Sequence, residues 1–220
     1  MIFRFTGLLF LIFSLAACSN FLSQKDSLPR NEKVESFSER TEKIDNLLDY
    51  DISEIESTIK KANKLGNKAS EFLADDLFMK ANDSSYRGDS KRALQYFEAL
   101  LKIRPEDDFV KKKHGVELIR AGELEKSKNV LEKVYEKGKF KEENLGLILG
   151  GVYTALDESS KAKKLYQSIL TRNPQNEEAC IFLSKIYVLK KNFKLSHKLL
   201  RNCENNISGK GVFSYYRGKI

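Results

Sequence analysis

Residues 143–176 read ENLGLILGGVYTALDESSKAKKLYQSILTRNPQN, and this stretch holds two helix-length apolar patterns on either side of a turn signal at 156–158. Pro174 closes the segment, and Pro105 stands 69 residues before it, which is twice 34.5. If each proline closes a unit, the chain repeats itself from one third of its length onward. The units then begin near Ala74, Asp108, Glu143 and Glu177, at spacings of 34, 35 and 34 residues.

Residue types recur along with this period. A small residue at the eighth position and another at the twentieth suit two helices that cross closely, and a large apolar residue at the twenty-fourth would wedge between them. One unit cannot bury its apolar face alone, whereas four stacked units can. The three sets are Ala81, Gly115, Gly150, Ser184 and Gly218; Ala93, Ser127, Ala162 and Ser196; and Phe97, Leu131, Tyr166 and Leu200.

The period and these positions resemble the tetratricopeptide repeat, a helix-turn-helix module of 34 residues. The resemblance implies an all-α, right-handed solenoid of about four repeats within residues 67–220, near 74–107, 108–142, 143–176 and 177–210, with a partial fifth at 211–220. The second unit departs from the pattern, with Lys139 in place of the closing proline and Leu118 in place of a tyrosine. A generic helical bundle with hairpins of the same length is the alternative.

The N-terminus carries a second pattern, an apolar run that ends in LAAC at residues 15–18. Arg4 supplies a positive charge before the run, which is too short to span a membrane. The pattern resembles the signal peptide and lipobox of bacterial lipoproteins. That resemblance implies removal of residues 1–17 and a lipidated Cys18 bearing diacylglycerol and an amide-linked acyl chain such as palmitate. An ordinary cleaved signal with a chance cysteine is the alternative.

This signal also predicts a location. A multiply acylated Cys18 would hold the protein firmly on a membrane. Ser19 follows the cysteine, where an aspartate retains lipoproteins on the inner membrane in many Gram-negative bacteria. We therefore expect a protein of the cell envelope, anchored in the outer membrane and facing the periplasm, with the inner membrane as an open alternative.

Two segments separate the signal from the repeats. Residues 18–40 are mostly polar and predict a flexible tether, although an ordered segment along the body is also possible. Residues 41–66 place apolar side chains at steps of three and four, which predicts an N-terminal helix that ends near Gly66 and caps the array. A coiled coil is less favoured, because residues 49–51 interrupt its few heptads.

Charge and cysteine content indicate which partners and which kind of fold the protein can have. The formal net charge is +8, but an exported protein would meet anionic lipid headgroups, cell-wall polymers or acidic proteins rather than nucleic acid. The chain has three cysteines, which is too few for a disulfide scaffold. Cys180 and Cys203 occupy the fourth and twenty-seventh positions of the fourth unit, where the ends of two antiparallel helices should meet. We expect two neighbouring buried thiols there, with a disulfide as the alternative.

No motif indicates catalysis. The two histidines, His114 and His197, lie outside any metal-ligand spacing, and nucleotide-binding or nucleophile-elbow patterns are absent from the sequence. The sequence therefore predicts a protein that is not an enzyme and that has no metal or cofactor apart from the covalent lipid. The lysine run 111–113 could contact phosphate-bearing lipid, but a solvated helix face is the simpler interpretation.

The repeat resemblance implies a peptide-binding groove lined by the first helix of each unit. Of the lysine and asparagine side chains that clamp a carboxylate in some repeats, only Asn82 and Lys113 are in place, so an amphipathic helix or extended apolar peptide is the expected ligand. The groove positions are Phe78, Asn82 and Tyr86; Lys112, Val116, Ile119 and Arg120; Leu147, Gly151 and Thr154; and Ile181, Lys185, Val188 and Leu189.

Two functions fit these features. The first is a membrane-anchored scaffold that docks envelope proteins during assembly of an outer-membrane or surface machine, of the barrel-assembly, pilus or gliding-motility type. The second is a recruiter or regulator of a periplasmic protease or peptidoglycan enzyme. Because the sequence stops within the first helix of a fifth unit, it also predicts a fragment of a longer repeat protein, unless residues 211–220 serve as a cap. The oligomeric state stays open.

Overall fold

The computed structural model describes residues 42–43, 47–48, 50–207 and 211–220. The expected signal peptide, Cys18 and the tether lie outside these residues. The repeats belong to one compact unit, Lys43–Ile220. Within the described residues all regular structure is helical, and none of these helices has both the length and the apolar character to cross a membrane.

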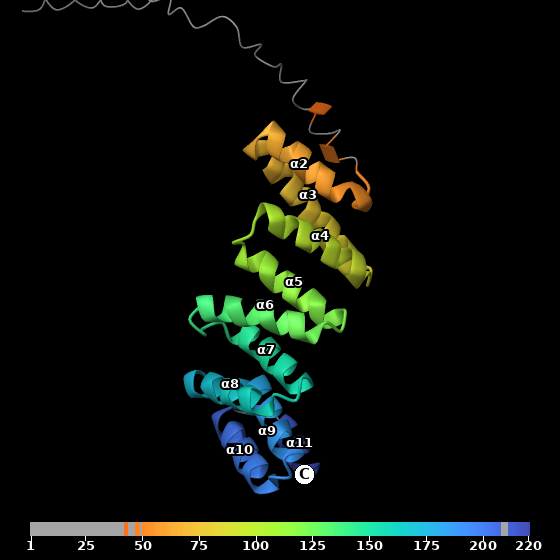
Figure 1. Cartoon of the computed structure of the whole chain (residues 1–220). Coiled ribbons are helices and arrows are strands. Elements are labelled where there is room, and N and C mark those ends of the chain that lie inside the picture. The colour runs from red at the N-terminus through yellow and green to blue at the C-terminus, as the bar shows by residue number, and fades with distance from the viewer. Residues whose placement is uncertain (1–41, 44–46, 49, 208–210) are drawn as a thin grey trace, which may run out of the picture. The chain divides into compact units, whose positions relative to one another are not determined.

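The helices follow one another in antiparallel pairs, and each packs mainly against its neighbours in sequence (Figure 1). The four repeat pairs are α3 with α4, α5 with α6, α7 with α8, and α9 with α10. This is the expected solenoid of four helix-turn-helix units. The elements are η1 (Ile52–Glu54), α2 (Ile55–Leu65), α3 (Asn67–Tyr86), α4 (Ser90–Ile103), α5 (Asp108–Arg120), α6 (Leu124–Lys137), α7 (Glu143–Ala155), α8 (Ser159–Arg172), α9 (Glu177–Leu189), α10 (Phe193–Asn206) and α11 (Val212–Gly218).

The turn inside each unit has the same backbone conformation. The fifteenth residue of each unit lies in this turn and has a positive φ of 55–79°. These residues are Gly88, Gly122, Asp157 and Lys191. Glycine adopts this conformation without strain, whereas the third and fourth units hold side chains there at a cost. The helix that follows the turn is capped by a side chain in the first and fourth units, from Asp89 and Asn192.

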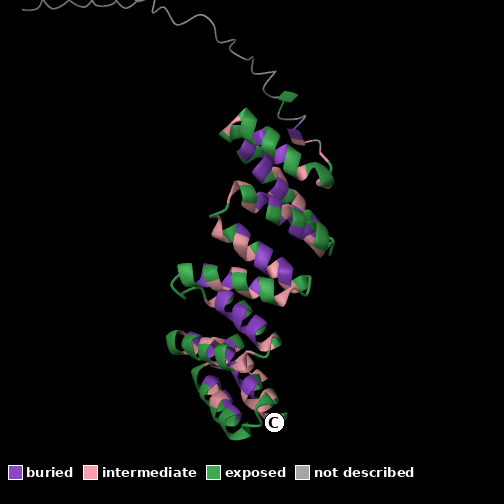
Figure 2. Ribbon diagram, viewed as in Figure 1, coloured by how far each residue is buried: buried purple, intermediate pink, exposed green. Residues whose placement is uncertain are grey.

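Buried residues form stripes along the helices of each unit (Figure 2). The small and large positions that the repeat register predicts for the four units are among them. Ala81 and Ala93 are completely buried. The Ser127 hydroxyl donates a hydrogen bond to the Gly115 carbonyl at 2.8 Å, which joins the twentieth position to the eighth across the second unit. Tyr166 is 1% exposed, so the large twenty-fourth residue does wedge between helices in the third unit.

The N-terminal helix differs from the expectation of one helix over 41–66. The backbone leaves the helix at residues 50–51, where the Asp51 carboxylate accepts a hydrogen bond from the Ser53 amide and starts η1. The following helix, α2, ends at Leu65, because Gly66 has φ 102°. Helix α3 then begins at once, seven residues before the predicted first unit, and α2 packs against α3 and α4.

Candidate functional site

An apolar groove lies between the first helices of the third and fourth units, and we call it the α7–α9 groove. Its volume is about 720 Å³. Apolar side chains dominate its walls, which is typical of sites that bind a peptide or small ligand. The lining residues are Asn144, Leu147, Ile148, Gly151, Thr154 and Ala155 from α7, Tyr166 from α8, and Glu178, Phe182, Lys185, Ile186 and Leu189 from α9.

Glycines on α7 give this groove its depth. A Cβ at Gly151 would meet no heavy atom within 4 Å, so the missing side chain leaves open space. A Cβ at Gly150 would stand 2.5 Å from the Tyr166 ring, so this glycine lets the ring approach α7 closely. The ring also lies 5.6 Å from that of Phe182, centre to centre. Burial raises the pKa of Tyr166 to about 12, so its hydroxyl stays neutral at physiological pH.

Charges lie on the α9 wall of the groove. The Lys185 ammonium is exposed and stands 5.5 Å from the centre of the Phe182 ring and 5.6 Å from that of Tyr216. Such contacts leave the charge available to a ligand while they hold the side chain in place. Glu178, two helical turns earlier, also lines the groove. The groove therefore presents an apolar floor with a cation and an anion along one wall.

A second, more polar cavity of about 330 Å³ lies along α5, and we call it the α5 pocket. Ile148 lines both cavities, so they adjoin along α7. The pocket includes several cationic side chains and one buried carboxylate. Its lining residues are Asn82, Ser85, Phe97, Phe109, Lys112, Lys113, Val116, Glu117, Arg120, Glu142 and Ile148.

The buried carboxylate of Glu117 is the centre of a polar cluster in this pocket. Its Oε2 atom accepts hydrogen bonds from the Ser85 hydroxyl at 2.6 Å and from Arg120 at 3.1 Å. Arg120 also donates to the Ser85 hydroxyl oxygen at 2.6 Å. The Glu117 side chain is 2% exposed, and its other oxygen, Oε1, is buried without a hydrogen-bond partner. Such an atom carries a desolvation cost until something donates to it.

The three lysines at 111–113 have different surroundings. Lys111 pairs with Glu106 at 3.5 Å, and Lys112 pairs with Glu142 at 3.0 Å. Lys113 lies 5.7 Å from the centre of the Phe109 ring and is exposed beside the α5 pocket. Two of the three lysines thus form ion pairs within the protein, and the third faces the pocket.

The structure brings many of the predicted groove residues together, in two cavities rather than one. Leu147, Gly151, Thr154, Lys185 and Leu189 line the α7–α9 groove. The predicted residues that line the α5 pocket are Asn82, Lys112, Val116 and Arg120.

Five predicted groove residues line neither cavity. Phe78 packs on the core, with its ring centre 5.9 Å from that of Phe109. Ile119 packs on the core cluster that extends from Leu131 of α6 to Ile186 of α9, and Ile181 packs on the cluster around Phe213 of α11. The other two are Tyr86, which is 91% exposed at the end of α3, and Val188, which is half-buried.

Sequence reasoning missed the second and sixth positions of the third and fourth units. Asn144 and Glu178 are second positions, and Ile148 and Phe182 are sixth positions. Together with the ninth and thirteenth positions they form a stripe at steps of three and four, which is one face of a helix. A search for that stripe would have selected Phe182 instead of Ile181. Glu117 has no comparable signal, because a glutamate on an amphipathic helix usually marks the solvated face.

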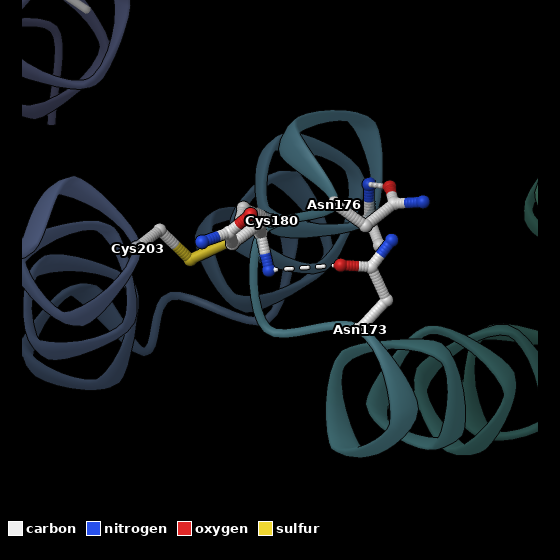
Figure 3. The surroundings of a disulfide bond; sticks show 6 residues. Asn173, Asn176, Cys180 and Cys203 are labelled. Atoms are coloured by element: carbon white, nitrogen blue, oxygen red, sulfur yellow. Dashed lines mark hydrogen bonds between the residues drawn. A yellow bond between two sulfur atoms is a disulfide. The ribbon is translucent and has the colours of Figure 1, made fainter. Parts of the chain in front are cut away.

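Cys180 and Cys203 form a disulfide between α9 and α10, with their Cα atoms 6.4 Å apart (Figure 3). This corrects the expectation of two free thiols. The two helices approach closely enough at this end for the bond, although average helix axes are 8–10 Å apart. Both cysteines are buried. Asn176 caps the start of α9 beside the bond and also donates to Glu143 at 3.0 Å.

The described residues hold no cluster of three or more histidine, cysteine or acidic side chains that could bind a metal ion. His114 is buried, and neither ring nitrogen has a hydrogen-bond partner. Burial lowers its pKa, which favours the neutral ring. His114 belongs to α5 and lines neither cavity, so it supplies no acid or base to them.

Comparison with known proteins identifies the repeats as tetratricopeptide repeats. The family profile described as "Psidin, N-terminal TPR repeats region" matches residues 83–200, more than half of the chain. The Phagocyte signaling-impaired protein of Drosophila pseudoobscura pseudoobscura is 31% identical over 107 residues, which make up 49% of this chain and 11% of that protein. This chain therefore spans a small part of its Drosophila relative.

Two solved structures share the fold. YrrB, described as a TPR protein with an unusual peptide-binding site, matches with a TM-score of 0.60 at 15% identity, over 95% of this chain and 98% of that one. A tetratricopeptide repeat protein from Parabacteroides merdae ATCC 43184 matches with a TM-score of 0.55 at 21% identity, over 59% of this chain and 52% of that one. At these identities the likeness establishes the fold alone.

Proposed function

Because the chain belongs to the tetratricopeptide repeat family described as the Psidin N-terminal TPR repeats region, we propose that it is a membrane-anchored scaffold that binds other proteins of the bacterial cell envelope. The fold is that of a protein-interaction scaffold. The α7–α9 groove is the observation that carries the proposal, because a cavity of about 720 Å³ with an apolar floor suits a segment of another protein.

The groove favours an amphipathic peptide as its occupant. Leu147, Ile148, Phe182 and Leu189 offer apolar contacts to the hydrophobic face of such a segment. The exposed ammonium of Lys185 would attract an acidic residue beside that face. An aromatic side chain in a groove of this kind often dominates the binding energy, so Phe182 is the residue whose loss should matter most.

Two features support the envelope location within this proposal. The LAAC sequence at residues 15–18 follows a short apolar run, as in lipoprotein signals. The disulfide between Cys180 and Cys203 is a bond that persists mainly in oxidising compartments such as the periplasm. A scaffold tethered there through Cys18 would present its groove to partners that assemble at the outer membrane.

Peptides selected from a random display library against the full chain test the groove. We expect those that bind to lose affinity by roughly tenfold or more on Phe182→Ala, because an aromatic contact in the wall of the groove is removed. Phe193→Ala is the matched control, since Phe193 is 47% exposed on α10 and lies outside the groove. Peptides that bind both variants as well as the unaltered protein would refute the groove as the binding site.

A further inference from the structure

The α5 pocket contains an acceptor that the protein itself leaves unused. The Glu117 side chain is almost fully buried, and Ser85 and Arg120 both donate to its Oε2 atom. Oε1 lies in the same buried group without a donor. A buried carboxylate oxygen normally accepts a hydrogen bond, and no group of the described residues donates to Oε1, so a donor on a ligand in the pocket would complete this group.

The charges around the pocket limit what that donor can be. Lys112, Lys113 and Arg120 line the pocket together with Glu117, so a cationic group would meet three positive side chains of which Lys113 has no carboxylate partner among the described contacts. An anionic group would bring its own lone pairs against Oε1. The remaining chemistry is a neutral group that carries a donor and an acceptor side by side.

We propose that the α5 pocket binds the primary amide of an asparagine or glutamine side chain, presented by the same peptide that occupies the α7–α9 groove. This inference rests on the proposed peptide-binding function. The ligand NH₂ group donates to Glu117 Oε1, and the ligand carbonyl accepts from the Lys113 ammonium. A hydroxyl would combine donor and acceptor on a single oxygen, whereas the amide carries them on two separate atoms.

The two cavities can hold one peptide because they share a wall. Ile148 on α7 lines both cavities. A segment that crosses Ile148 would place its apolar face against Phe182 and its amide near Glu117. The groove then supplies most of the affinity, and the pocket supplies selectivity, since a site built to accept a hydrogen bond rejects ligands that lack the donor.

The substitution Glu117→Gln gives a direct test, because it reverses the hydrogen-bonding character of one atom. In Glu117→Gln the carbonyl oxygen still accepts from Ser85 and Arg120, while an NH₂ group replaces Oε1 and becomes a donor. Peptides that prefer glutamine with the unaltered protein should then prefer glutamate. Glu136→Gln is the matched control, because Glu136 is exposed on α6 and no α6 residue lines the pocket.

The measurement uses the peptides selected against the full chain, with each asparagine or glutamine replaced in turn by glutamate, leucine and lysine. On the unaltered protein we expect one amide position at which every replacement lowers affinity by on the order of tenfold to a hundredfold. Glu117→Gln should invert the glutamine-to-glutamate preference, and Glu136→Gln should leave it unchanged.

The possible failures are distinguishable. Selected peptides that lose binding on Phe182→Ala but show no amide position would overturn this inference and leave the groove intact. An amide preference that Glu117→Gln does not alter would also overturn it. Peptides indifferent to Phe182→Ala would refute the proposed groove itself. The absence of any amide position on the unaltered protein would overturn the inference even if Glu117→Gln does not fold.

Discussion

Two adjacent glycines on α7 offer a sharp test of the helix packing, because alanine should have opposite effects at them. In Gly150→Ala the new Cβ would stand 2.5 Å from the Tyr166 ring, about 0.9 Å closer than the 3.4 Å at which ordinary contact begins. Tyr166 is 1% exposed, so it has little room to move. Overpacking of this kind costs about 1–3 kcal/mol. In Gly151→Ala the Cβ meets nothing within 4 Å.

Both changes gain about 1 kcal/mol from the higher helix propensity of alanine. Gly151→Ala should therefore stabilise the protein by about 1 kcal/mol, whereas Gly150→Ala should range from neutral to a loss of about 2 kcal/mol. The two variants should therefore differ in stability by about 1–3 kcal/mol. For a chain of this size, each kcal/mol shifts the thermal midpoint by roughly 2–4 °C. Urea denaturation and thermal melts followed by far-UV circular dichroism measure it. Equal stability of the two variants would refute the close crossing of α7 and α8.

Four further predictions address the core, the buried histidine, the disulfide and the anchor. Ala93→Leu should lower stability by about 1–3 kcal/mol by overpacking the first unit, and thermal melts identical to those of the exposed-site variant Lys91→Ala would contradict the register. Burial lowers the folded-state pKa of His114, so the unfolded chain binds the extra proton first and stability should fall as pH drops below 6.5; urea titrations of His114→Gln should lack that decline. Cys203→Ser should cost about 2–4 kcal/mol and abolish the effect of reducing agent on the melting temperature; an unaltered protein whose melting temperature does not respond to reducing agent would contradict the disulfide. Cys18→Ala should leave an unprocessed or mislocalised precursor on membrane fractionation, and normal processing with membrane retention would defeat the proposed anchor.

The periodic part of the fold could be predicted from the sequence, because the same residue types recur at the same packing positions in four units. The small residues at the eighth and twentieth positions had to face each other for four units to share one geometry, and the hydrogen bond from Ser127 to the Gly115 carbonyl joins these positions. The break at residues 50–51 lies outside the repeats, so no other unit predicts it. Its cause is a single local cap by Asp51, which competes with an otherwise continuous apolar stripe.

The candidate site was less predictable because a groove depends on the direction of each side chain. A shift of one residue rotates a side chain by about 100° around a helix. That rotation separates Ile181, which packs toward α11, from Phe182, which lines the groove. The burial of Glu117 depends on Ser85 of the preceding unit, 32 residues away, so no local pattern reveals it. The disulfide depends on how closely α9 and α10 approach, which a spacing of 23 residues does not fix.

We propose that the α7–α9 groove of an anchored scaffold holds a segment of another envelope protein. Site-specific photo-crosslinking in cells tests it most directly, with a photoreactive phenylalanine analogue at position 182 in the groove or at position 193 on α10. We predict that position 182 crosslinks one defined segment of an outer-membrane barrel, secretin or surface-machine component, and that position 193 does not. Hydrolases captured at position 182 would contradict the assembly role, and the same products from both positions would contradict binding in the groove.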